Sequence, residues 1–156
     1  MSMHRLYRQQ QIQASLPQVW RFFSDARNLA QLTPPYMRMR MRITSGEMAD
    51  EIYPGMVITY KVSPVAGIAL SWMTEITHAE KERLFVDEQR HGPFSLWHHQ
   101  HLFREYAGGV QMTDIVHYRL PLSFIGDMVH AAFIRRQLQD IFDFRQRRIE
   151  TLFKNE

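Results

Sequence analysis

Two histidines separated by one residue are the strongest candidates for chemistry in this sequence. His99 and His101 share their spacing of two with Trp97 and Phe103, and side chains at this spacing point to the same face of a β-strand. Two of the four residues are large aromatics, so we expect this face to point into the protein. A buried imidazole can transfer a proton, orient a ligand or bind a metal ion.

Asp114 is the acidic residue that we expect beside these imidazoles. Gly108 and Gly109 predict a tight hairpin turn between two strands. Pairing about this turn places Asp114 opposite His101 or Phe103, on a face that is otherwise mainly apolar. A carboxylate in this place would fix the tautomer of an imidazole and raise its pKa.

Three kinds of role are open for this cluster. It could be structural, because buried polar groups need hydrogen-bond partners. It could recognise a carbonyl or hydroxyl group of an otherwise apolar ligand. It could perform general acid–base catalysis, with His99 or His101 as the acid–base group and Asp114 as its orienter. Two imidazoles and one carboxylate would also suit a metal ion by residue type, but we predict neither a metal nor another cofactor.

The elements that must position these residues follow from the hydropathy pattern. A short helix is expected after Ser15, which caps it, with Pro17 in its first turn. A second short helix, capped by Asp25 and Asn28, is expected before the Pro34-Pro35 pair. Alternation of apolar and polar residues predicts seven strands, at 4–13, 37–43, 56–62, 70–76, 84–90, 94–105 and 110–119.

The apolar spacing changes to a helical period at Leu122 and keeps it to Phe153. Strands joined by short turns are antiparallel, and a sheet of seven strands curls. We therefore predict an α+β helix-grip fold with a single domain over residues 1–156. In this fold a curved seven-stranded antiparallel sheet, with two short helices, closes over one long C-terminal helix. Space left between the sheet and this helix would be a ligand site.

Three stretches carry a family resemblance. They read PQVWRFFSDARNL at 17–29, FVDEQRHGPFSLWHHQHLF at 85–103 and GVQMTDIVHYRLP at 109–121. Together they resemble the START-like, or Bet v 1-like, superfamily, also called SRPBCC, over residues 4–153. The second stretch is similar to a bacterial subgroup of small cyclase/dehydrase-like proteins, sometimes labelled as related to a cell-division inhibitor. The resemblance implies the helix-grip fold and a lipophilic cavity.

The sequence thus predicts a binding protein without catalytic turnover that holds a small apolar or aromatic molecule, lipid-like or polyketide-like. One alternative is a polyketide cyclase or dehydratase that uses a cavity histidine as acid or base. Another is a module that binds a partner protein through the basic face of its long helix, with an incidental cavity. The expected ligand-binding residues are Tyr60, Trp72, Trp97, His99, His101, Phe103, Asp114, Tyr118, Phe142 and Arg145.

Arg145 lies on the inward face of the predicted helix. We expect it either to reach the rim of the cavity or to pair with Asp87 or Asp114. It also belongs to a basic run with Arg147 and Arg148, which we interpret as a solvated face. The same interpretation applies to the alternating arginines of the second predicted strand, which are Arg38, Arg40 and Arg42.

The composition argues against several other classes of protein. The 156 residues include 45% hydrophobic and 22% charged residues, as in folded domains. The absence of cysteine excludes disulfides, thiolate metal sites and cysteine nucleophiles. A net charge of +3 without a reading motif gives no sign of nucleic-acid binding. We expect no signal peptide, no transmembrane segment and a cytoplasmic location, and we leave open a homodimer or a partner protein.

Overall fold

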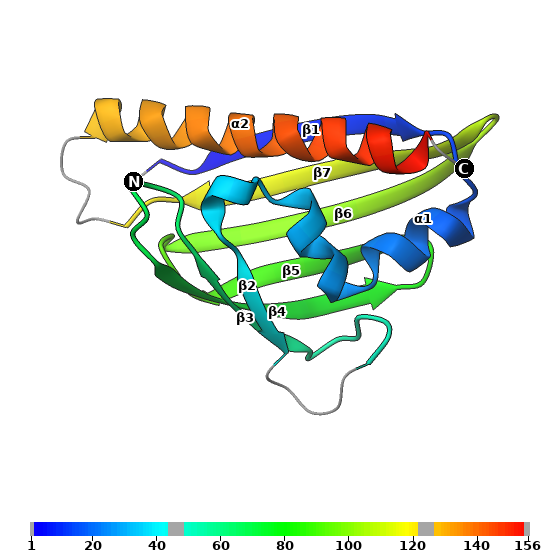
Figure 1. The fold of residues 1–156 in the computed structure, drawn as a ribbon, viewed down its shortest axis with the longest axis horizontal. Coiled ribbons are helices and arrows are strands. Elements are labelled where there is room, and N and C mark those ends of the chain that lie inside the picture. Colours follow the sequence, from blue (N-terminus) through cyan, green and yellow to red (C-terminus); the bar gives the residue numbers. More distant parts are fainter. Residues whose placement is uncertain (1, 44–48, 122–126, 155–156) are drawn as a thin grey trace.

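The computed structural model describes residues 2–43, 49–121 and 127–154. Within them, seven strands form one antiparallel sheet in the order β1-β7-β6-β5-β4-β3-β2 (Figure 1). From β2 to β7, each strand pairs with the next strand along the chain, and β1 closes the order against β7. The strands are β1 (His4–Ile12), β2 (Arg40–Ile43), β3 (Val57–Val62), β4 (Leu70–Glu80), β5 (Leu84–His91), β6 (Leu96–Tyr106) and β7 (Gly109–Arg119).

The long helix α2 (Asp127–Phe153) lies along the sheet, beside β1 (Figure 1). The shorter helix α1 (Leu16–Phe23) and two 3-10 helices, η1 (Ala26–Leu32) and η2 (Pro35–Met37), lie on the same side of the sheet as α2. The predicted α+β helix-grip arrangement is therefore confirmed. None of the helices in the described ranges is both long and apolar enough to cross a membrane.

Local sequence signals explain where the short helices begin. Ser15 and Gln18 form a reciprocal capping box at the start of α1: the Ser15 Oγ accepts from the Gln18 backbone N–H at 3.4 Å, and the Gln18 Oε1 accepts from the Ser15 N–H at 3.0 Å. Asp25 caps η1, as predicted, by accepting from the Arg27 N–H at 3.0 Å. Asn28 does not cap it: it lies within η1, and its Nδ2 donates to the Phe22 carbonyl at 2.9 Å.

One strand begins later in the structure than the sequence predicts. The strand predicted at 37–43 begins only at Arg40, because Met37 ends η2 and Arg38 has a left-handed backbone with φ of 48°. Non-glycine residues seldom adopt this conformation, and it interrupts the extended backbone although exposed and less exposed residues still alternate. The predicted start of the long helix at Leu122 lies outside the described residues.

The apolar core has two packed regions, and β6 crosses both of them. Trp97 packs in one region with Leu138 and Phe142 of α2, and Phe103 packs in the other with residues of α1. His99 and His101 lie between these two aromatic positions on the same strand face, and they are 5% and 4% exposed. The predicted inward face of β6 is therefore correct, and the fold places two imidazoles at the junction of its two apolar regions.

Candidate functional site

A cavity of about 200 Å³ lies between the sheet, α2 and the segment that contains α1 and η1. Its walls are mainly apolar: η1 contributes leucines, β3 contributes Ile58 and Val62, and α2 contributes Leu138 and Ile141. The structure brings seven of the ten sequence-predicted ligand residues to this cavity. They are Tyr60, Trp72, Trp97, His99, His101, Phe142 and Arg145.

The other three predicted residues do not line the cavity. Phe103 packs in the core, with its ring centroid 5.5 Å from that of Trp20. Tyr118 stacks on His4, with ring centroids 5.2 Å apart. Asp114 does not reach the cavity wall, but it contacts both imidazoles. Alternation along a strand predicted the buried face correctly, but it could not separate cavity-lining positions from fully packed ones.

Two carboxylates flank the two imidazoles. His99 Nε2 lies 2.8 Å from Asp114 Oδ1, and His101 Nε2 lies 2.6 Å from Asp87 Oδ2. The remaining ring nitrogens face the opposite carboxylates: His101 Nδ1 is 3.2 Å from Asp114 Oδ1, and His99 Nδ1 is 3.6 Å from Asp87 Oδ2. The ring centroids are 3.7 Å apart. Each imidazole therefore lies between the same two acids.

The strand register produces this arrangement. His101 pairs with Asp114 across β6 and β7, and His99 pairs with Asp87 across β5 and β6. The first pairing is one of the two that we predicted from the hairpin turn. The second was missed: Asp87 was considered only as an ion-pair partner of Arg145. Thr74 of β4, also missed, lies beside this carboxylate: its Oγ1 is 3.5 Å from Asp87 Oδ1 and donates to the Glu88 carbonyl at 3.0 Å.

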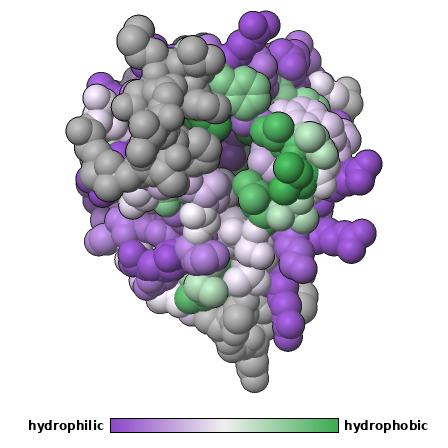
Figure 2. Space-filling view, turned by 90° about the vertical axis from the view of Figure 1, so that its left-hand side faces the viewer, coloured by the Kyte–Doolittle hydropathy of each residue, from purple (hydrophilic) through white to green (hydrophobic). Residues whose placement is uncertain are grey.

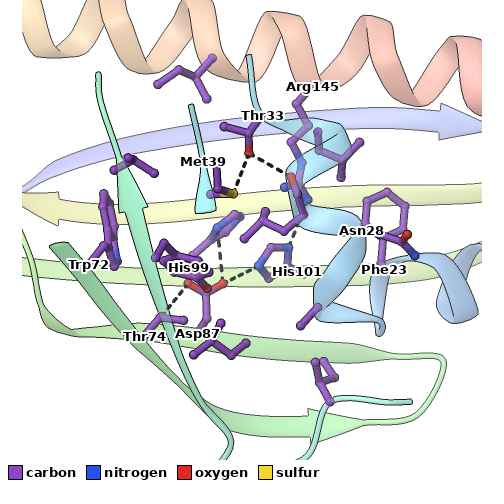
Figure 3. A pocket seen from close by; sticks show the side chains of 18 of the residues that line it. Phe23, Asn28, Thr33, Met39, Trp72, Thr74, Asp87, His99, His101 and Arg145 are labelled. Carbon is purple, nitrogen blue, oxygen red and sulfur yellow. Dashed lines mark hydrogen bonds and ion pairs between the residues drawn. The ribbon is translucent and has the colours of Figure 1, made fainter. Parts of the chain in front are cut away.

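Arg145 of α2 completes the cluster from above (Figure 3). Its Nη2 lies 3.5 Å from Asp114 Oδ1 and 3.4 Å from His101 Nδ1, so the predicted pairing with Asp114 is correct. Arg145 is 7% exposed, so it neither reaches the rim nor belongs to a solvated face. Its guanidinium carbon lies 5.6 Å from the ring centroid of Phe23 and 5.9 Å from that of Phe142.

One donor of Arg145 has no acceptor. Its Nε is buried and makes no hydrogen bond to any part of the chain that the structure describes. A buried N–H without a partner costs roughly 1–3 kcal/mol. Arg145 lines the cavity through other atoms, whereas this Nε is covered by its neighbours and has an unused bonding capacity.

The two carboxylates of the cluster are ionised. Burial alone would raise the pKa of Asp114, but Arg145 and the hydrogen bonds from His101 and His99 hold it well below its usual value. Burial would also raise the pKa of Asp87, but the neighbouring His99 and the hydrogen bond from His101 lower it. Two negative charges therefore lie beside the imidazoles.

The pKa values of the two imidazoles shift in opposite directions. Burial lowers the pKa of His99, and the neighbouring His101 adds to this effect, so His99 stays neutral near pH 7. Burial would lower the pKa of His101 as well, but hydrogen bonds to Asp114 and Asp87 raise it. The positive charge of Arg145 beside Asp114 offsets part of the negative charge of the two carboxylates, which reduces the free-energy cost of burying them.

The cluster also has the donor set of a metal site. Asp87, His99 and His101 each offer one ligand atom, and these atoms lie within 4.8 Å of one another. In Figure 3 the Asp87 carboxylate faces both imidazoles. Among the described residues, no other such group of three histidine or acidic side chains occurs.

The end of the molecule at which α2 begins carries apolar surface. Hydrophobic side chains border a depression on this face (Figure 2). The exposed large hydrophobic residues of the chain include Val65 and Ile68, between β3 and β4, and Phe133 on α2. Gln137 Nε2 donates to the Pro64 carbonyl at 2.7 Å, so α2 is tied to this β3–β4 connection.

Known proteins share this architecture. Residues 12–146 match the family model described as polyketide cyclase / dehydrase and lipid transport. The chain is similar to the crystal structure of Ara h 8.0201, with a TM-score of 0.66, 14% identity and coverage of 95% of this chain and 98% of that chain. No curated protein matches the sequence.

Two further solved structures have the same fold. Ginseng major latex-like protein 151 from Panax ginseng has a TM-score of 0.67 and 15% identity, with coverage of 97% of both chains. TTHA0849 from Thermus thermophilus has a TM-score of 0.65 and 16% identity, with coverage of 95% of this chain and 97% of that chain. At these identities the likeness establishes the fold alone.

Proposed function

The chain belongs to the polyketide cyclase / dehydrase and lipid transport family, and on this basis we propose that it is a non-catalytic binding protein for a small, largely apolar molecule with one oxygen acceptor. The molecule occupies the cavity between the sheet and α2. A resemblance to the subgroup related to a cell-division inhibitor, and a cytoplasmic location, stay predictions from the sequence.

The volume of the cavity supports a small guest. An apolar cavity of about 150 Å³ is enough to bind benzene, and this cavity measures about 200 Å³. One or two fused rings therefore fit without a change in the protein. Trp72 and Trp97 offer flat apolar surfaces, with their ring centroids 5.2 Å apart and their planes at 89°. An elongated lipid or a large polycycle would need the cavity to expand.

The unused donor of Arg145 is the observation that carries this proposal. Nε is covered in this structure, and a turn of the guanidinium toward the cavity would let a guest oxygen accept from it and remove the penalty of a buried, unpaired N–H. The site would then follow the usual pattern of ligand pockets, in which apolar walls give affinity and a few placed polar groups fix orientation. The guest is a phenol, a ketone or another molecule with one acceptor attached to a ring system.

A pair of matched probes tests this proposal. 2-Naphthol has two fused rings and one oxygen, and naphthalene has the rings alone. We expect 2-naphthol to bind more tightly in a fluorescence titration, and Arg145→Lys to weaken its binding about tenfold, close to the value of one hydrogen bond. Arg145→Lys keeps the charge beside Asp114 but has no Nε–H.

Arg147→Lys is the matched control, because Arg147 is exposed on the same helix. It should leave the binding of both probes unchanged. Failure of 2-naphthol to bind, or equal binding by the wild type and Arg145→Lys, would contradict the proposal. The first of these results would favour a protein-interaction role with an incidental cavity.

Catalysis is the second candidate function, and the neutral imidazole of His99 favours it. Burial keeps this imidazole neutral by lowering its pKa, its Nε2 is bonded to Asp114, and it lines the cavity. A general base needs a neutral nitrogen, an orienting partner and access to the substrate. His99 would then act as the base of a cyclase or dehydratase, with Asp114 positioning it.

Turnover and binding separate the two candidates. If His99→Ala abolishes conversion of a short polyketone, followed by mass spectrometry, without weakening its binding, the protein is an enzyme. If the wild type binds the polyketone and returns it unchanged, the binding protein is the correct assignment.

A further inference from the structure

Three potential metal ligands share one side of the imidazole pair. Asp87 Oδ2 lies 3.6 Å from His99 Nδ1 and 2.6 Å from His101 Nε2. Ligand atoms bound to a tetrahedral Zn²⁺ at about 2.0 Å are roughly 3.3 Å apart, and the two observed distances lie on either side of this value. All three ligand atoms lie within 4.8 Å of one another, so small side-chain rotations would bring them around one ion.

Asp114 occupies the place of an outer-sphere partner. It contacts His99 Nε2 at 2.8 Å and His101 Nδ1 at 3.2 Å, which are the nitrogens that point away from Asp87. Histidines that bind a metal almost always donate their other ring N–H to a carboxylate, a carbonyl or water. Asp114 would thus hold the proton on the far nitrogen of each ring and direct the lone pairs toward Asp87.

The position of the cavity gives such an ion an open coordination site. Asp87, His99 and His101 all line the cavity, whereas Asp114 does not. Three protein ligands with one remaining position are typical of metal sites that bind an exchangeable molecule. Closed structural sites use four protein ligands instead.

We propose that Asp87, His99 and His101 bind one divalent transition-metal ion, with Asp114 as the positioning residue behind both imidazoles and an open ligand position toward the cavity. The sequence predicted no metal, and its candidate carboxylate was Asp114. In the structure, the carboxylate placed to bind the ion is that of Asp87 and not that of Asp114. Metal binding does not depend on a guest in the cavity, so it can be tested apart from the proposed function.

The donor set selects the class of ion. Two imidazole nitrogens and one carboxylate oxygen suit Zn²⁺, Co²⁺, Ni²⁺ or Fe²⁺ rather than Mg²⁺ or Ca²⁺, which prefer oxygen ligands. Without thiolates, the site has no preference for the softest ions. Zn²⁺ is the appropriate probe for affinity, and Co²⁺ reports the coordination geometry through its visible absorption.

The experiment uses the full chain without a histidine tag. We expect the wild type to retain one Zn²⁺ per chain after equilibrium dialysis, measured by elemental analysis. With Co²⁺ we expect the intense visible bands of a four-coordinate site. Asp87→Asn should weaken Zn²⁺ binding by more than the roughly 10–100-fold that loss of an outer-sphere partner costs, and Asp114→Asn should fall within that range.

His98→Ala is the matched control, because His98 precedes His99 on β6 and lies with Glu88, its neighbour at 3.7 Å, on the other face of the sheet. It should leave Zn²⁺ binding unchanged. One measurement uses only the wild type, so it remains informative if a variant fails to fold. In the wild type, Zn²⁺ should shift the imidazole NMR signals of His99 and His101 but not those of His98. Sub-stoichiometric Zn²⁺, retention of full affinity in folded Asp87→Asn, or a shift confined to His98 would overturn the proposal.

Discussion

The Nε2 of His99 lies 2.8 Å from the Oδ1 of Asp114, in a hydrogen bond that is buried between β6 and β7. Both residues are nearly inaccessible, at 5% and 6% exposure. The pair therefore lies among apolar groups, where a polar group without a partner is unfavourable. The bond links the chemistry of the site to the stability of the fold.

This relationship predicts different effects for two adjacent histidines. His99→Ala removes a partner from buried Asp114 and should lower the free energy of unfolding by about 1–3 kcal/mol. His98→Ala changes a partly exposed side chain on the other face of the same strand and should stay within about 0.5 kcal/mol. Urea unfolding measures both. If His99→Ala lowers the free energy of unfolding as little as His98→Ala does, the buried cluster contributes little to stability.

Because of the cavity, we expect that one valine can be replaced by a larger residue with little loss in the free energy of unfolding. Val62 lines the cavity of about 200 Å³, so we expect a Phe side chain at this position to extend into it. Val62→Phe should change the free energy of unfolding by less than about 1 kcal/mol, whereas overpacking of a filled core costs about 1–3 kcal/mol. Val110 provides the matched control, because it is 0% exposed and does not line the cavity.

Val62→Phe should also prevent the binding of 2-naphthol, because the new ring takes the place of the guest. Urea unfolding and a fluorescence titration on the same samples measure both effects. If Val62→Phe destabilises the protein as much as Val110→Phe does, the cavity is filled in solution.

The ionisation of Tyr60 gives a prediction for alkaline pH. Burial raises the pKa of Tyr60 well above its ordinary value, and the charge of Asp87 adds to the shift. The unfolded chain releases this proton near pH 10, before the folded chain does. The contribution of Tyr60 to stability is therefore complete below about pH 10 and declines as the pH rises further.

Urea unfolding at about pH 9 and about pH 11 measures this decline. Tyr60→Phe has no proton to lose, so its stability should fall by up to about 1.4 kcal/mol less than that of the wild type over this interval. Tyr7→Phe alters an exposed tyrosine and should behave as the wild type does. A decline of the same size in Tyr60→Phe would contradict the assigned burial.

The strands were largely predictable because alternation and turn chemistry act locally. The turn predicted at Gly108 and Gly109 lies one residue earlier, at Ala107 and Gly108, and it fixes the register of β6 and β7 that brings His101 opposite Asp114. The strand predicted at 37–43 was partly wrong, because Met37 ends η2 and Arg38 then adopts a left-handed conformation before β2 begins. Alternating residue types do not carry that information.

Asp87 could not be placed by the same reasoning. Its spacing of two from Phe85 does put both residues on one face of β5. Its partner on β6, however, depends on the longer connection between the strands, which does not fix the register as a two-residue turn does. The unpaired Nε of Arg145 is a property of packing, and no sequence pattern reports it.

A crystal structure of the protein with 2-naphthol tests the central claim most directly. We predict that the rings lie in the cavity against Trp72 and Trp97, and that the hydroxyl oxygen accepts from Arg145 Nε at about 2.9 Å. A complex with the rings on the surface, or with the oxygen turned away from Arg145, would contradict the claim that this cavity and this arginine form one binding site.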